Sequence, residues 1–409
     1  MSESYHKENA WWVSPYNEEA DVRGSMQFSP NLKLHDATLR DGEQTPGVVM
    51  SPDDKKRIAD ELMELGVERI EAGMPAVSSD DQKAIRMICR NKGDTQIFTF
   101  ARAMKADVDM ALECGADGVV VEVPIGYPKI RYQFGWTWET VLEKSVETIN
   151  YAKQNGLYVV YFPYDTTRSR KQDLENLLQG IMNNAKPDSI GLVDTMGCAL
   201  PQTIDYLVRK IKRMTGLPVE VHTHNDFGLA VATELAGAAA GAEVLHTCVN
   251  GLGERTGNAP LEELIMALKL LCGVEKPYKI ERMNNLCRLV SELTGVPIAH
   301  NKPFSGAGNY ARESGIGINF VMEQPLVMFA TDPRYFGREA QVVLGKKSGK
   351  KSIEYMLDKM GVKANDEQIS DMLLDVKELS IAQKRLVTVQ EFETIAAKRL
   401  GEGSHAAKQ

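Results

Sequence analysis

Two histidines separated by one residue carry the strongest chemical signal in the chain. His222 and His224 stand in the run Val221-His222-Thr223-His224-Asn225-Asp226, directly after the extended segment 218–221. Residues i and i+2 of a strand point to the same face, so both imidazoles project side by side. Two satisfied core histidines are the alternative interpretation. The chain has only seven histidines, however, and a pair in phase followed by Asn-Asp favours a divalent metal site.

A second polar cluster follows the first predicted strand and includes Asp36, Arg40, Asp41 and Glu43. Asp41 could add a carboxylate to a metal ion held by the two histidines. Arg40 could stabilise an oxyanion. A solvated acidic turn is the alternative, but the position at the end of a strand favours a functional role.

A glycine-rich run, 250–259, follows the last predicted strand. Glycine permits a tight backbone path close to a ligand. This loop could approach a phosphate or place Asn258 on the metal ion. Turns use glycine in any case, so the run alone is weak evidence.

The elements that must position these residues recur with a regular period. Eight short β-branched or aromatic runs alternate with helical patterns such as 53–65 and 138–154. This alternation predicts a (β/α)8 TIM barrel, with the functional groups at the C-terminal ends of its strands. A doubly wound open sheet is the runner-up. The eight runs are 32–36, 69–73, 97–101, 118–123, 158–163, 189–194, 219–224 and 244–250.

Three parts are predicted along the chain. Residues 1–31 form an N-terminal extension, residues 32–276 form the catalytic TIM barrel, and residues 277–409 form small, mostly helical subdomains. In the last part, helical stretches such as 283–294 and 352–360 lack alternating strands. A total of 409 residues suits a barrel of about 250 residues with a further domain.

Composition limits the class of protein. A net charge of −8 argues against nucleic acid as a partner, because a phosphate backbone needs a basic surface. The chain has neither a membrane-length apolar segment nor the pattern of a signal peptide. Its six cysteines lack disulfide-like or metal-binding spacing, which indicates a reducing cytoplasm. We therefore expect a cytoplasmic protein that has neither a nucleic acid nor a membrane as its partner.

Five motifs in order resemble a known family: the metal-dependent barrel synthases of isopropylmalate, homocitrate and citramalate, with hydroxymethylglutaryl-CoA lyase as a more distant relative. The resemblance extends over residues 34–350, including Val343-Leu344-Gly345-Lys346-Lys347-Ser348-Gly349. The five motifs are Asp36-x-Thr38-Leu39-Arg40-Asp41-Gly42-Glu43-Gln44, Ile70-Glu71-Ala72-Gly73-Met74-Pro75, Val193-Asp194-Thr195-Met196-Gly197, His222-Thr223-His224-Asn225-Asp226 and Asn250-Gly251-Leu252-Gly253-Glu254-Arg255-x-Gly257-Asn258.

The resemblance implies a set of site residues and a chemistry. The metal ligands would be Asp41, His222, His224 and Asn258, and the ion Mn, Mg, Zn or Co. Arg40 would stabilise an enolate, and Thr195 would hold the carboxylate of a 2-oxo acid. Arg168 and Glu71 would complete the substrate site. An acetyl-CoA enolate then attacks the keto carbon, which the metal ion polarises.

Two departures from the family pattern leave the proton-transfer group open. The tail loop of the synthases has His-Glu-Ser-Gly-Ile-His, whereas this chain has Arg312-Glu313-Ser314-Gly315-Ile316-Gly317. Arginine stays protonated and can clamp an anion but cannot act as a base. After the fifth strand, Phe162-Pro163-Tyr164-Asp165 replaces Ser-Pro-Glu-Asp. Glu43, Tyr164 or Tyr310 would have to transfer the proton, and a neutral tyrosine is a poor base.

Three functions follow, in order of preference. The first is a Claisen-type condensation of an acyl-CoA, expected to be acetyl-CoA, with a 2-oxo acid. The second is an aldolase or C–C lyase that acts on a hydroxy or oxo acid without CoA, with Arg312 on a distal anionic group. The third is a non-catalytic barrel that keeps a metal ion for stability. The resemblance also implies amino-acid biosynthesis and a homodimer in which each tail covers the neighbour's barrel mouth.

Overall fold

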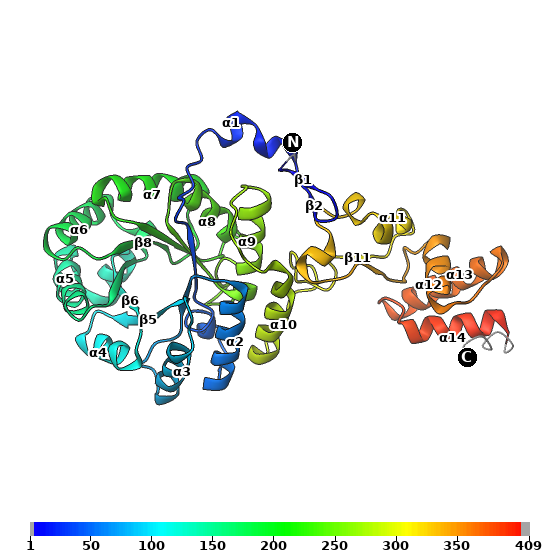
Figure 1. Cartoon of the computed structure of the whole chain (residues 1–409), viewed down its shortest axis with the longest axis horizontal. Coiled ribbons are helices and arrows are strands. Elements are labelled where there is room, and N and C mark those ends of the chain that lie inside the picture. Colours follow the sequence, from blue (N-terminus) through cyan, green and yellow to red (C-terminus); the bar gives the residue numbers. More distant parts are fainter. Residues whose placement is uncertain (1–3, 402–409) are drawn as a thin grey trace. The chain divides into compact units, whose positions relative to one another are not determined.

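The computed structural model describes residues 4–401 of the chain. These divide into two compact units. One unit is the barrel, Ser14–Ile298, and the other joins the segment before Ser14 to the chain from Ala299 onward. Each unit is described by itself, and Figure 1 labels the elements of both.

Eight parallel strands form a closed barrel in the order β10-β3-β4-β5-β6-β7-β8-β9. Closure comes from the pairing of β10 with β3, in which His246 lies opposite His35 and Thr247 opposite Asp36. The strands are β3 (Lys33–Asp36), β4 (Arg69–Glu71), β5 (Gln96–Arg102), β6 (Gly118–Pro124), β7 (Tyr158–Tyr164), β8 (Ser189–Asp194), β9 (Val219–Thr223) and β10 (Val244–Thr247).

A ring of helices surrounds these strands (Figure 1). Helix α2 (Pro52–Leu65) shows why the boundaries fall where they do: Ser51 and Asp54 form a capping box, and Gly66 ends the helix in the left-handed conformation. The other helices of this unit are α1 (Ala20–Arg23), α3 (Ser79–Arg90), α4 (Lys105–Cys114), α5 (Trp138–Gln154), α6 (Lys171–Asn184), α7 (Pro201–Thr215), α8 (Ala230–Ala239), α9 (Leu261–Leu270) and α10 (Met283–Thr294).

The interior of the barrel has an apolar side and a charged side. Alternate residues of each strand point inward, so the types at alternate positions decide what fills the barrel. Strands β5 to β8 contribute a buried apolar cluster, whereas β3, β4, β9 and β10 contribute buried charged and imidazole groups. The apolar cluster is Phe98, Phe100, Val120, Val160, Phe162 and Val193. The charged side is His35, Arg69, Glu71, Glu220, His222 and His246.

The second unit has two small sheets and a helical core. Strands β1 (His6–Lys7) and β2 (Trp11–Trp12) pair antiparallel, and β11 (Ala311–Arg312) pairs parallel with β12 (Gln341–Val342). Its longer helices pack around a buried cluster that includes Ile353, Met372 and Phe392. The helices of this unit are α11 (Ile318–Glu323), α12 (Lys350–Met360), α13 (Asp366–Gln383) and α14 (Val389–Leu400).

The predicted fold class is confirmed. Each of the eight predicted runs coincides with one barrel strand, and the helices expected at 138–154 and 283–294 are α5 and α10. The structure divides the chain after Val13 and after Ile298, whereas the sequence predicted divisions after residues 31 and 276. No helix in the described part of the chain is long and apolar enough to span a membrane.

Candidate metal centre and active site

Three potential ligand atoms converge at the C-terminal end of the barrel. The Nε2 atom of His222 lies 3.2 Å from Asp41 Oδ2, and that of His224 lies 3.6 Å from the same oxygen. The two Nε2 atoms are 3.4 Å apart. All three side chains are buried. Donor atoms at these separations can bind one divalent ion, and we call the three residues the mouth cluster.

Backbone pairing between the first and last barrel strands places Asp41. The amide of Ala37 donates to the carbonyl of Thr247 at 2.8 Å, so the turn after β3 continues the pairing with β10. The hydroxyl of Thr38 then accepts from the amide of Val249 at 2.8 Å. The amide of Asp41 donates back to Ala37 and closes the turn. This tight turn directs the Asp41 side chain towards His222 on β9.

The glycine-rich loop after β10 places Asn258 beside the mouth cluster. Gly257 has φ +77°, and a Cβ there would lie 1.8 Å from the Gly251 carbonyl oxygen, so the close turn requires glycine. The amide nitrogen of Asn258 donates to Asp41 Oδ2 at 3.1 Å and to the Leu252 carbonyl at 3.0 Å. Its Oδ1 is buried and has no hydrogen-bond partner among residues 4–401. Asn258 therefore holds Asp41 in place and offers one spare oxygen.

Charge and burial keep the mouth cluster in the protonation state that metal ions bind. Burial lowers the pKa of His224 to about 4 and also lowers the pKa of His222, so both imidazoles are neutral at pH 7. Burial alone would raise the pKa of Asp41, but Arg40 and the histidines hold it well below its usual range. A carboxylate and two neutral imidazoles are the forms that bind divalent metals.

Arg40 is fixed by Glu71 of β4. Its Nη2 donates a hydrogen bond to Glu71 Oε2 at 3.0 Å, and its Nε lies 2.9 Å from Glu71 Oε1 as a second ion-pair contact. The guanidinium also lies over the ring of Phe100, 4.7 Å from the centroid. Burial would lower the pKa of Arg40, but Glu71 and Asp41 raise it well above its usual range. The side chain is thus a permanently charged and well-oriented cation.

Thr195, which follows β8, has a hydroxyl that makes a hydrogen bond within the protein. Its Oγ1 accepts a hydrogen bond from the Asp165 amide at 2.9 Å. Since the oxygen is occupied as an acceptor there, its proton remains available for a ligand. Arg168, by contrast, is held by Asp165 through contacts of 2.7–3.0 Å. Arg168 is not among the residues that line the adjoining cavity.

A small cavity of about 180 Å³ joins these groups. Arg40 and Thr195 face it together with the mouth cluster, and Phe100, Phe162 and Val193 form its apolar wall. The lining residues are Arg40, Asp41, Gln44, Phe100, Glu122, Lys129, Phe162, Tyr164, Val193, Thr195, His222, His224 and Glu254.

The candidates for proton transfer have different environments. Glu43 accepts from the Met50 amide at 3.0 Å and pairs with Lys55 at 2.5 Å, so both of its oxygens are engaged. Tyr164 lines the cavity, but burial and the nearby Glu122 and Asp165 raise its pKa to about 12. In the other unit, Tyr310 is buried with its hydroxyl bonded to Thr331 at 2.7 Å. Arg312 lies there on β11 and donates to the Ile316 carbonyl.

Three residues at the cavity or its rim were missed by sequence reasoning. Glu122 and Lys129 both line the cavity. Arg255 bonds Asp226 at 2.8 Å and also donates to the Thr195 carbonyl, which ties the ends of β8 and β9 together. A signal for Glu122 was present, because it is the single charged residue in Gly118–Pro124 and shares a strand face with Val120.

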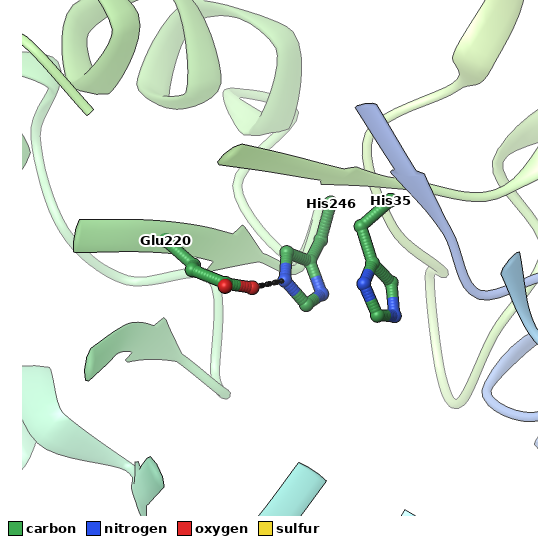
Figure 2. A group of neighbouring side chains, drawn as sticks. All are labelled: His35, Glu220 and His246. Atoms are coloured by element: carbon green, nitrogen blue, oxygen red, sulfur yellow. Dashed lines mark hydrogen bonds and ion pairs between the residues drawn. The ribbon is translucent and has the colours of Figure 1, made fainter. Parts of the chain in front are cut away.

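A second His-His-carboxylate cluster lies deeper in the barrel (Figure 2). We call His35, Glu220 and His246 the interior cluster. His246 Nε2 is 2.9 Å from Glu220 Oε2, and the ring of His246 stacks on that of His35 at 4.2 Å with an interplanar angle of 10°. Arg69 pairs with Glu220 Oε1 at 2.8 Å. None of the interior cluster residues lines the cavity described above.

Comparison with known families identifies the barrel. Residues 31–290 match the model described as HMGL-like. The chain belongs to the HMGL-like family. In this HMGL-like protein, residues 305–384 also match a model described as homocitrate synthase post-HMGL domain-like. Its curated relatives include homocitrate, citramalate and isopropylmalate synthases that are 35–40% identical to it over most of the chain. The resemblance seen in the sequence is confirmed.

Two relatives and one solved structure illustrate the match. A homocitrate synthase of Methanopyrus kandleri is 39% identical over 93% of this HMGL-like chain and 95% of its own length. An (R)-citramalate synthase of Methanocaldococcus jannaschii is 39% identical over 85% of this chain and 70% of its own. The crystal structure of hydroxymethylglutaryl-CoA lyase from Pseudomonas aeruginosa shares the barrel fold, with a TM-score of 0.59 and 19% identity over 67% of this chain and 96% of its own.

Proposed function

We propose that this enzyme of the condensing-synthase family joins an acyl-CoA, acetyl-CoA above all, to a 2-oxo acid in a Claisen-type reaction that depends on a divalent metal ion. The product would be a 2-hydroxy-2-substituted dicarboxylic acid. The observation that supports this proposal is the convergence of Asp41, His222 and His224 on one side of a cavity that Arg40 and Thr195 also face.

The residues fit a divalent ion on their own geometry. The donor atoms of Asp41, His222 and His224 lie close enough together to share one ion. The spare, buried Oδ1 of Asn258 is a fourth oxygen that such an ion could use. One carboxylate, two imidazoles and an amide suit Mn, Zn, Co or Mg. When bound, the ion would act as a Lewis acid that draws electron density from the keto carbon.

The residues around the cavity have separate tasks in this reaction. Arg40 would hold the negative charge that develops on the thioester oxygen when the acyl donor becomes an enolate. Glu71 keeps the guanidinium in position through one hydrogen bond and a second ion-pair contact. The Thr195 hydroxyl would donate to the carboxylate of the oxo acid. The apolar wall of Phe100, Phe162 and Val193 would exclude water from the enolate until the C–C bond has formed.

The test is an assay for free thiol. The purified protein, loaded with Mn²⁺, is mixed with acetyl-CoA and a panel of 2-oxo acids that includes pyruvate, 2-oxoisovalerate and 2-oxoglutarate. We expect thiol release with one or more of these acids and none without an acid. No thiol release with any oxo acid would contradict the proposal. Cleavage of a 2-hydroxy or 4-hydroxy-2-oxo acid by the Mn²⁺-loaded protein in a separate assay without CoA would then favour a lyase.

A further inference from the structure

The proposed condensation needs a group that removes a proton from the methyl carbon of the acyl donor. The groups considered from the sequence do not provide a free base in the cavity. Glu43 is engaged by Lys55 and the Met50 amide. Tyr164 keeps its proton at neutral pH because its pKa is about 12. A carboxylate that was not a candidate from the sequence, Glu254, also lines the cavity, but it pairs with Arg255 at 3.5 Å and is half exposed to solvent.

Glu122 is a carboxylate in the right place. It lies on β6, where its register partner on β7 is Phe162 and where Pro124 lies opposite Tyr164. It faces the cavity with Arg40, Thr195 and His222. The other residues of Gly118–Pro124 are apolar, and Val120 on the same face belongs to the buried apolar cluster. A charged side chain at this position has no packing role that valine would not fill better.

The surroundings leave the carboxyl of Glu122 free to exchange a proton. Within residues 4–401 no hydrogen bond or ion pair engages it, although its side chain is only partly accessible through the cavity. Burial raises its pKa to about 7, against the opposing effect of Arg40 and Lys129. An acid with a pKa near the working pH is both a usable base and a usable acid. The charged and titratable groups that face it are Arg40, Lys129, Asp41, Glu71 and Tyr164.

We propose that Glu122 is the catalytic base that deprotonates the acyl donor, and the acid that protonates the product. This inference rests on the proposed condensation. It places the base on β6, next to the β7 position where the sequence shows Tyr164 in place of an acidic residue. Glu122 and Tyr164 thus lie on neighbouring strands and line the same cavity.

The step balances in protons and electrons. The Glu122 carboxylate takes a proton from the methyl carbon of the thioester, and the C–H electron pair becomes the enolate that Arg40 stabilises. The enolate carbon forms a bond to the keto carbon of the oxo acid, whose C=O electron pair becomes an alkoxide. Glu122 returns its proton to the alkoxide oxygen. Water then hydrolyses the thioester and releases free CoA thiol, so Glu122 ends in its starting state.

The first experiment compares Glu122→Gln with Glu122→Asp in the metal-loaded protein. Glutamine keeps the shape of the side chain but cannot accept a proton, so kcat should fall about 10²- to 10⁴-fold. The KM for the oxo acid and the affinity for Mn²⁺ should change less than about threefold, because neither depends on the base. Glu122→Asp keeps a carboxylate, so its kcat should lie between those of the unmodified protein and Glu122→Gln. Glu139→Gln, on the exposed surface of α5, serves as the matched control and should retain full activity.

Two further readouts separate a base from a structural residue. The acidic limb of the kcat/KM profile, expected near pH 7, should vanish in Glu122→Gln and remain in Glu254→Gln. The rate with [²H₃]acetyl-CoA should show a larger isotope effect in Glu122→Gln, because proton removal becomes limiting. Circular dichroism and Mn²⁺ binding establish that the variant is folded.

The outcomes distinguish this inference from the proposed function. If Glu122→Gln keeps kcat within about threefold, or keeps the acidic limb, Glu122 is not the base although the condensation stands. If the unmodified protein releases no thiol with any oxo acid, the condensation fails and this assignment fails with it. A collapse of Mn²⁺ binding in Glu122→Gln would also overturn the assignment, because the residue would then act through the metal site.

Discussion

The mouth cluster and the interior cluster have the same composition, two histidines and one carboxylate, but different neighbours. In the mouth cluster the ring nitrogens point at Asp41, and the cavity adjoins them. In the interior cluster the two rings stack in parallel, so their in-plane lone pairs cannot meet at one point. Arg69 also neutralises Glu220 there. The comparison indicates that the metal site proposed for the mouth cluster depends on convergent lone pairs as well as on the right residue types.

Each cluster has an arginine counter-ion, Arg40 beside Asp41 and Arg69 beside Glu220, but the interior carboxylate is held by more contacts. Glu220 has its pKa held well below the usual range by Arg69, despite burial that would raise it. It also accepts from the Ser189 hydroxyl at 2.7 Å. Burial and the neighbouring His35 lower the pKa of His246 to about 4. The interior cluster is therefore a closed, hydrogen-bonded packing network, whereas the mouth cluster differs from it in facing a cavity.

The largest expected loss of activity comes from a substitution that disrupts the mouth cluster and leaves the interior cluster intact. Asp41→Asn should remove the anionic ligand and cost about 4 kcal/mol of transition-state stabilisation, a factor of about 10³ in turnover. Metal content by mass spectrometry should fall from one ion per chain towards none. His246→Gln is the matched control in the interior cluster and should retain one ion. Two ions per chain in the unmodified protein would show that the interior cluster also binds metal.

Removing the carboxylate of the interior cluster should affect folding instead of metal content. Glu220→Gln leaves Arg69 buried beside a neutral amide, and we expect a loss of about 3 kcal/mol in the free energy of unfolding. Urea denaturation measures this. The double variant with Arg69→Met should lose less than the sum of the single variants, because no charge is then left unpaired. If the double variant loses as much stability as the two single variants together, Arg69 and Glu220 do not stabilise the protein as a pair.

Glu71 contacts both regions, and its replacement should reduce turnover without loss of metal. Its Oε1 lies 2.9 Å from Arg40, and its Oε2 lies 3.7 Å from His35 in the interior cluster. Glu71→Gln weakens the hold on the guanidinium, so kcat should fall about 10- to 100-fold. Bound Mn²⁺, counted by electron paramagnetic resonance, should stay at one per chain. A variant that loses the ion together with its activity would make Glu71 part of the metal site.

The smallest effect concerns the pH dependence of stability and follows from the carboxyl of Glu122, which lines the cavity. The pKa of Glu122 is raised in the folded protein to about 7, so its charged form is disfavoured there. The stability associated with its neutral form is present at low pH and is lost as pH rises through about 7. Glu122→Gln should therefore gain about 1 kcal/mol, or about 2 °C in Tm, at pH 8 and nothing at pH 4. Calorimetry at both pH values checks the sign. A gain at pH 4 alone would show that the pKa is not raised.

The fold and much of the mouth cluster could be predicted from local sequence. The alternation of apolar runs and helical patterns marks each barrel strand, and the i, i+2 spacing of His222 and His224 places both rings on one face. Asp41 and Arg40 could be anticipated because they follow a strand end. These signals are local, so a single sequence shows them.

The interior cluster and Glu122 could not be predicted in the same way. His35 meets His246 only because β10 closes the barrel against β3. The side chain that Glu122 faces, Arg40, belongs to the turn after a different strand. A lone glutamate in an apolar strand could equally well face solvent. Whether it faces solvent or the inside of the barrel depends on which face of the strand points inward. Such contacts depend on closure of the sheet, which local pattern does not encode.

The pairing of the first barrel strand with the last has a consequence for biosynthesis of the protein. Asp41 and its partner Asn258 are 217 residues apart in the chain. During translation the ribosome therefore releases Asp41 long before the histidines and the final loop emerge. If these residues bind the metal ion as proposed, the complete ligand set forms only after nearly the whole barrel has emerged, so full coordination would come late in synthesis.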